Sequence, residues 1–219
     1  MPVPENTATS APASAAPRLV VPGVQLLRAA LAAIAAVMIT FSPDHSAALG
    51  LAVFSGFAVA TALVLGFGAW MAYPAGRRWP VAALAVVTLI AGMFGGVPAW
   101  RTTPVFFAVV IAWSAVAGVV ELIEGWRERQ LLDPDDAQRR SESRDAIVVG
   151  GLGLVLAAAV AIVPAGYSLD YVIDEAGQFT LTGTTIAVGL FGAYAAIVAV
   201  YLGIAAFSPR RTTTSEEGA

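Results

Sequence analysis

One acidic side chain stands inside an apolar stretch of the chain. Glu121 follows Trp113 and Gly118 in a run of apolar residues and precedes the bases Arg127 and Arg129. A carboxylate is costly to bury at membrane depth, so Glu121 is a candidate site that binds a proton or pairs inside a helix bundle. The alternative is a helix end that emerges among lipid headgroups, where Glu121 and neighbouring acids form solvated pairs with these arginines.

A second candidate site is a short turn that contains the only histidine. His45 follows Asp44 directly, and histidine titrates near neutral pH, which favours a role in sensing acid. Alternatively, Asp44 caps the helix that follows and His45 is an ordinary turn residue. The acids Asp170, Asp174 and Glu175 are either another group that responds to acid or a solvated loop.

The sequence carries no pattern typical of an enzyme. It has no nucleophile–base pair, no metal-ligand spacing and no glycine loop before a lysine that would cradle a phosphate. There is no cysteine, which excludes disulfides, thiolate metal sites and catalytic thiols. The acidic run at 133–136 is flanked by Arg139 and Arg140 and indicates a solvated linker. We therefore expect a non-enzymatic protein with no cofactor and no metal.

Composition indicates a membrane protein. The 219 residues are 58% hydrophobic and only 12% charged, whereas soluble domains carry about 25% charged residues. Net charge is −3 without a basic block, so no nucleic-acid partner is expected and the lipid bilayer is the expected environment. Six apolar segments are each close to the ~20 residues that cross a bilayer as a helix. They are Val24–Ser42, Ala47–Ala69, Val81–Val97, Val105–Gly125, Ala146–Pro164 and Thr184–Phe207. The predicted fold is an all-α polytopic membrane protein with six transmembrane helices.

The arginines predict the orientation of these helices. Of the twelve basic residues, Arg101 alone falls on one side of the predicted helices, and the other eleven fall on the opposite side, with Arg18 and Arg28 counted as preceding the first helix. The positive-inside rule then places both termini in the cytoplasm. Trp70, Trp79 and Trp126 would lie at the cytoplasmic interface and Trp100 at the outer one.

The chain divides into two tails and one membrane domain. Residues 1–23 are rich in Pro, Ala, Ser and Thr, which predicts a disordered cytoplasmic tail. A six-helix domain follows over 24–208, and 209–219 form a second cytoplasmic tail. Residues 165–183 form a long acidic outer loop that could include a short interfacial or re-entrant piece. Helix packing is the expected role of Gly92-x3-Gly96 and of Gly150, Gly151 and Gly153.

The even-numbered segments align without gaps, which predicts an internal repeat. The aligned stretches are Leu51–Trp70, Phe107–Trp126 and Val188–Phe207. An aromatic residue recurs at Phe57, Trp113 and Tyr194, and a small residue follows each at Ala62, Gly118 and Ala199. We therefore predict three tandem hairpins, at about 24–70, 80–126 and 145–207. Glu121 is peculiar to its copy, since the aligned residues are Leu65 and Leu202.

This pattern resembles the HdeD-like acid-resistance membrane proteins. The similar features are three tandem hairpins, a proline at each outer turn, and Trp113-x4-Gly118-x2-Glu121 ahead of basic residues. The resemblance covers about Gln25 to Ser208. It implies a multi-pass protein of the bacterial plasma (inner) membrane that is linked to acid or envelope stress, with no catalytic residues to carry over.

Two other functions stay open. A small-molecule or proton transporter or channel would be favoured by a continuous polar path along Thr40, Ser55, Thr61, Thr88 and Ser114. An accessory or scaffold subunit of a larger membrane complex would be favoured by a large apolar helix face that is left unpaired. A homo-oligomer is a further possible form of partnership.

Overall fold

The computed structural model describes residues 16–72, 78–131, 136–174 and 177–207. The predictions for residues 1–15, for 209–219 and for most of the 133–136 linker lie outside these residues. The described chain forms six long helices: α1 (Ala16–Thr40), α2 (Ala47–Ala72), α3 (Trp79–Gly96), α4 (Thr103–Leu131), α5 (Ala137–Ile162) and α6 (Gly183–Phe207). All six are long and apolar enough to cross a membrane. The predicted all-α polytopic membrane fold is confirmed.

The helices extend beyond the apolar segments at one end of the bundle. α1 begins at Ala16, so helix and not a disordered tail occupies residues 16–23. α4 continues to Leu131 and α5 begins at Ala137, outside the predicted limits at 125 and 146. Asp136 caps α5 by accepting a hydrogen bond from the Arg139 nitrogen at 3.1 Å. Hydropathy marks only the lipid-facing length of a helix, and polar residues continue these helices past it.

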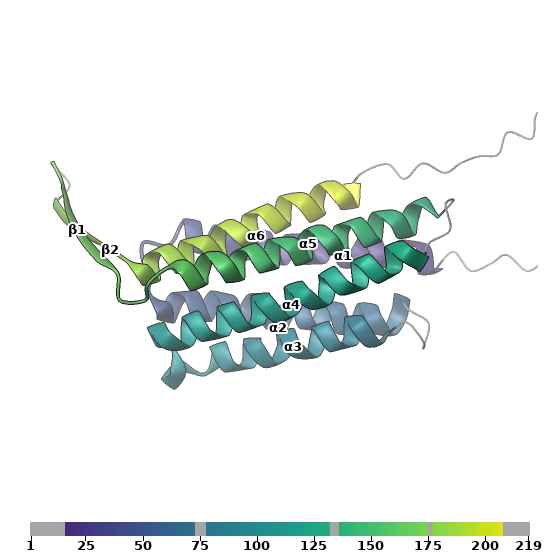
Figure 1. Cartoon of the computed structure of the whole chain (residues 1–219), viewed down its shortest axis with the longest axis horizontal. Helices are drawn as coiled ribbons and strands as arrows, with labels where there is room; N and C mark the ends of the chain where they lie inside the picture. The colour runs from purple at the N-terminus through teal and green to yellow at the C-terminus, as the bar shows by residue number, and fades with distance from the viewer. Residues whose placement is uncertain (1–15, 73–77, 132–135, 175–176, 208–219) are drawn as a thin grey trace, which may run out of the picture.

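The six helices form a closed ring in chain order, with α6 packed against α1. The most extensive packing joins α4 to α5, α1 to α6 and α2 to α3, and the two helices of each predicted hairpin touch less. α2, α4 and α6 also touch one another, so they line the inside of the ring. Both described chain ends lie at one end of the bundle, here called the terminal end (Figure 1).

The opposite end, here called the hairpin end, carries an antiparallel pair of strands (Figure 1). β1 (Ser168–Ile173) pairs with β2 (Gly177–Thr182), so that Tyr171 lies opposite Phe179. Their rings stack with centroids 5.9 Å apart. The expected interfacial or re-entrant piece is therefore a β-hairpin. Alternating apolar residues favour strands, and Gly177 adopts the left-handed φ of 99° at the start of β2.

Glycines let α4 and α5 approach each other closely. A Cβ added at Gly150 would lie 2.7 Å from the backbone oxygen of Gly118, and one at Gly92 would lie 2.9 Å from the backbone nitrogen of Val59 in α2. The predicted packing role is confirmed for Gly92 and Gly150. It is wrong for Gly151, which has nothing within 4 Å of such a Cβ.

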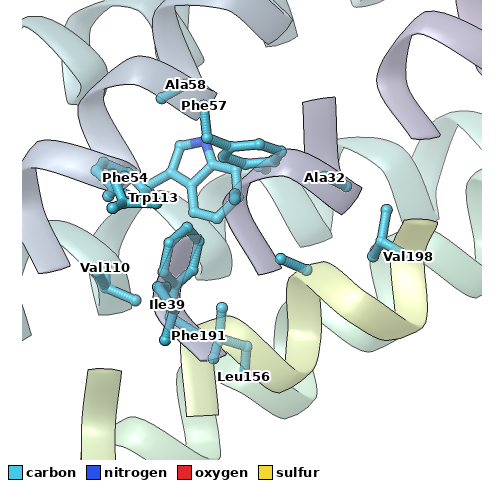
Figure 2. Packing of buried hydrophobic residues seen from close by; sticks show 14 of the residues in the cluster. Ala32, Ile39, Phe54, Phe57, Ala58, Val110, Trp113, Leu156, Phe191 and Val198 are labelled. Atoms are coloured by element: carbon cyan, nitrogen blue, oxygen red, sulfur yellow. The ribbon is translucent and has the colours of Figure 1, made fainter. Parts of the chain in front are cut away.

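Aromatic side chains fill the centre of the ring. The rings of Phe57 and Tyr194 lie edge-on to Trp113, with centroids 5.9 and 6.0 Å away. Phe54 and Phe191 lie one helical turn nearer the hairpin end, and Phe54 contacts Trp113 at 5.2 Å. Figure 2 shows Phe54, Phe57, Trp113 and Phe191 gathered together. We call Phe54, Phe57, Trp113, Phe191 and Tyr194 the aromatic cluster. Each edge-on pair of this kind contributes about 0.5–1.5 kcal/mol to stability beyond the effect of burial.

The glycine contacts predict a sharp contrast between adjacent residues. Gly150→Ala forces a methyl group against the backbone of α4 and is expected to cost about 1–3 kcal/mol of stability. Gly151→Ala meets open space, so its stability should be unchanged or slightly raised by better helix propensity. Thermal unfolding of the two purified variants in one detergent tests this. Equal melting temperatures would contradict the close approach of α4 and α5.

Candidate functional site

Glu121 is held by an arginine from the opposite side of the ring. Arg28 Nη2 of α1 donates to Glu121 Oε1 of α4 at 2.5 Å. The two side chains are only 16% and 9% exposed. Arg127, in contrast, pairs with Glu124 at 3.6 Å on the exposed part of α4. Of the two interpretations of Glu121, the structure shows the buried pair and not the solvated helix end.

Helical periodicity explains why the two charged groups meet. Glu121 lies on the same face of α4 as Trp113 and Ala117, which are buried residues at spacings of four. Arg28 lies one turn before Ala32, which is fully buried on the inner face of α1. Each charge therefore lies on the inward-facing side of its helix, in the half nearer the terminal end.

A small chamber lies between the ion pair and the aromatic cluster. Its volume is about 20 Å³, which is enough for about one water molecule. Four hydroxyl-bearing residues line it, one from each of α2, α3, α4 and α6: Thr61, Thr88, Ser114 and Tyr194. The Trp113 indole nitrogen donates to Thr88 Oγ1 at 3.2 Å, and Ser114 Oγ donates to the backbone oxygen of Val110 at 2.6 Å.

A much larger cavity opens at the terminal end. This vestibule has a volume of about 570 Å³, within the usual range for small-molecule sites. Trp79 and Val81 form part of its apolar wall, and Glu124 and Arg139 are among the charged residues that also line it. The wall of the vestibule therefore combines apolar surface with charges of both signs.

Four residues line both the chamber and the vestibule, and they form the partition between the two cavities. They are Arg28, Leu65, Leu84 and Glu121. The ion pair thus lies at the boundary between a wide, open space and a narrow, buried one. Whatever passes from the vestibule to the chamber must pass beside these charges.

The predicted polar path through the bundle is not continuous in the described residues. Thr61, Thr88 and Ser114 do gather at the chamber. Ser55, however, donates to the backbone oxygen of Gly92 at 2.7 Å and so fastens α2 to α3. Thr40 lies exposed at the end of α1. Toward the hairpin end, the aromatic cluster follows the chamber and the path stops there.

The remaining predicted residues separate into two groups. Trp113 and Gly118 line the chamber together with Glu121. Asp44 and His45 lie in the turn between α1 and α2 at the hairpin end, and they are not among the residues that line the chamber or the vestibule. Asp44 accepts two hydrogen bonds from Ser46, both at 2.8 Å.

Ser46, and not Asp44, caps α2. Its Oγ accepts a hydrogen bond from the Leu49 nitrogen at 3.3 Å, which is the geometry of a helix N-cap. Asp44 instead fixes the position of Ser46. The expected capping role of Asp44 is therefore corrected to a supporting one.

Arg28 is the residue of this candidate site that sequence reasoning missed. It was grouped with the basic residues that precede the first span. The available signal was that Arg28 lies inside an apolar helix, after Leu26 and Leu27 and before Ala29. An arginine in that position must either reach water or find a partner.

The chain carries no candidate metal centre in its described residues, since no three His, Cys, Asp or Glu side chains gather there. Comparison of the chain with protein-family models, with curated proteins and with solved structures finds no match. The case for function therefore depends on the geometry of the ion pair and its two cavities.

The ion pair predicts strong coupling between two distant residues. Arg28→Leu or Glu121→Leu alone leaves one charge facing an apolar side chain, and each should cost about 3–5 kcal/mol. The double variant removes both charges and should recover most of that loss. Thermal unfolding of the four proteins in detergent measures the coupling.

The exposed pair Arg127–Glu124 provides a matched control for this cycle. Its side chains are 68% and 35% exposed, and exposed pairs contribute about 0–1 kcal/mol. At the control pair, the stability losses of the two single variants should add up to that of the double variant. The same additivity at Arg28 and Glu121 would exclude a buried interaction between α1 and α4.

Proposed function

We propose that this integral membrane protein is non-enzymatic, is of the HdeD-like type, and acts in acid or envelope stress through its Arg28–Glu121 pair. The observation that carries the proposal is the place of the pair, buried in the bundle but at the inner wall of an open vestibule. A carboxylate in that place can take up a proton when the compartment beside it becomes acidic. Arg28 would then face a neutral acid, and the balance of charge inside the bundle would change.

The proposed setting is the bacterial plasma membrane, with the terminal end in the cytoplasm. The arginine bias supports this orientation. Trp79 and Trp126 are exposed on helices at the terminal end, and Trp100 is exposed at the hairpin end, as expected of residues at the two membrane interfaces. The vestibule would then open to the cytoplasm, and Glu121 would respond to cytoplasmic acid.

The proposed three-fold repeat is supported by burial at aligned positions. Phe54, Val110 and Phe191 align in sequence, and each is 0% exposed. The aligned aromatics Phe57, Trp113 and Tyr194 meet at the centre of the ring. This agreement supports three related units, of which the middle one carries the carboxylate.

A transporter or channel is less well supported. The hydroxyls at the chamber favour polar passage, but the aromatic cluster fills the ring beyond them. Leu51 and Val188, further toward the hairpin end, are 0% exposed. The arrangement therefore favours a protein that binds or senses at one face over one that conducts.

An accessory or scaffold subunit is the second candidate, and the β-hairpin favours it. Leu169, Tyr171 and Phe179 are exposed large apolar residues on strands that lie beyond the spans. Apolar residues exposed together outside the membrane are typical of a contact surface for another protein. Copurification of membrane proteins with the intact chain, but not with Tyr171→Ser, would support this candidate.

The stress role predicts an acid-sensitive phenotype. A deletion strain should survive low external pH less well than its parent, and the intact gene should restore survival. Glu121→Gln removes the titratable group with little change in shape and should fail to restore it, whereas the same change at the rim residue Glu124 should succeed. Colony counts after an acid pulse provide the measurement, and His45→Ala tests the alternative acid sensor.

Normal survival of the deletion strain would remove the proposed stress role. If Glu121→Gln fully restores survival, the protein has a role in stress, but that role does not depend on the Glu121 carboxylate. If His45→Ala is the only variant that fails to restore survival, the acid sensor is His45, in the turn between α1 and α2. Immunoblots of membrane fractions must show equal amounts of each variant.

The orientation is tested independently by reporter fusions. Green fluorescent protein fused after Ala219 should fluoresce, and alkaline phosphatase in the same place should be inactive, because the C-terminus is expected in the cytoplasm. Phosphatase inserted at Asp174, between β1 and β2, should be active. The reverse result at both sites would invert the proposed topology.

A further inference from the structure

Two buried polar atoms lack a partner, and both belong to residues that line the cavities. Among the described residues, Gln25 Oε1 and Thr61 Oγ1 are the buried side-chain atoms without a hydrogen bond. Gln25 lines the vestibule and Thr61 lines the chamber. An unsatisfied buried polar group costs about 1–3 kcal/mol. Each atom faces a cavity large enough for water, which indicates that water is the missing partner.

The chamber has the properties of a water site. Thr61 is 5% exposed, so its hydroxyl is removed from bulk solvent, and the chamber volume of about 20 Å³ exceeds the ~10–15 Å³ that one water needs. A buried water also needs about two to four polar partners. Thr61, Glu121 and Arg28 line the same small space and can supply them.

We propose that the chamber is a water-binding site in which one water joins the Thr61 hydroxyl to the Arg28–Glu121 pair. The site is reached only from the vestibule. The partition at Leu65 and Leu84 admits water at the terminal end, and the aromatic cluster closes the other end. This inference goes beyond the proposed stress role and depends on the geometry of the cavities alone.

The bound water gives Glu121 a one-sided route for proton exchange. The water passes one proton to the carboxylate and regains one from the solvent of the vestibule, so the net change is one proton added to Glu121, while the charge of Arg28 is unchanged. The titratable and charged groups that face Glu121 or line the vestibule come from α1, α4, α5 and α6. They are Arg28, Glu124, Arg127, Glu128, Arg139, Glu142 and Tyr194. The residues of α2 and α3 that line the two cavities carry no charge.

The absence of cysteine allows a direct accessibility experiment. Thr61→Cys puts a single thiol of similar size in the chamber, and silver ion is a thiol-reactive probe small enough for a narrow path. The variant is reconstituted in sealed vesicles and exposed to silver on one side. After denaturation, a fluorescent maleimide then measures the thiols that remain free.

Three single-cysteine controls define the result. Val81→Cys reports access to the vestibule, Ser168→Cys reports access to the hairpin end, and Val110→Cys reports the closed region beside the aromatic cluster. Thr61→Cys should lose maleimide labelling from the same side as Val81→Cys, while Val110→Cys keeps its labelling from both sides. If Thr61→Cys does not assemble, Ala117→Cys tests the same chamber.

Three outcomes would overturn the inference. The chamber is closed to solvent if silver blocks the thiol of Val81→Cys but leaves Thr61→Cys fully labelled by maleimide. The entrance is at the hairpin end if silver blocks Thr61→Cys from the same side as Ser168→Cys. Loss of labelling at Val110→Cys would show that the aromatic cluster does not close the path. None of these results bears on survival in acid, so failure here and failure of the stress role are distinguishable.

A stability measurement tests the water itself. Thr61→Val keeps the shape of the side chain but removes its hydroxyl. If a water joins that hydroxyl to the ion pair, the variant loses a hydrogen bond and its melting temperature should fall. If the chamber is dry, the change removes an unsatisfied group and the melting temperature should stay level or rise. The second result would exclude the bound water.

Discussion

The pairing of Arg28 with Glu121 is the constraint on which the interior of this bundle depends. Either charge alone would be expensive at this depth, because a membrane interior offers no water to solvate it. The two residues come from α1 and α4, which lie on opposite sides of the six-helix ring. Their bond therefore crosses the ring, and it separates the vestibule from the chamber. The pair thus joins two helices that do not pack side by side in the ring.

The chamber lies where the three inner helices carry different residues at the same level. At the level of the ion pair, two inner helices supply Leu65 and Leu202, and the third supplies Glu121. One turn nearer the hairpin end, α2 supplies Thr61, where the aligned residue of α6 is Val198. Because Tyr194 of α6 also lines the chamber, polar groups from all three inner helices face one small space. Nearer the hairpin end, the same helices bury the apolar residues Phe54, Val110 and Phe191.

Much of this organisation could be predicted from the sequence, and the limits have physical causes. Hydropathy found the spans, and the apolar setting of Glu121 marked it as a candidate. The partner could not be predicted, because 93 residues separate Arg28 from Glu121 and only the closure of the ring brings α1 opposite α4. The β-hairpin was also missed, although the alternation around Tyr171 and Phe179 was visible, because the acidic residues of that loop dominated its interpretation.

The same geometry limits what the bundle can do. Passage through the ring would require at least Trp113 to leave its contacts with Phe54, Phe57 and Tyr194, and such contacts contribute about 0.5–1.5 kcal/mol each beyond burial. It would also have to separate helices whose glycines bring their backbones together at Gly118 and Gly150. Access to Glu121 from the vestibule requires neither change. The structure is therefore better suited to exchange water and protons with one compartment than to connect two.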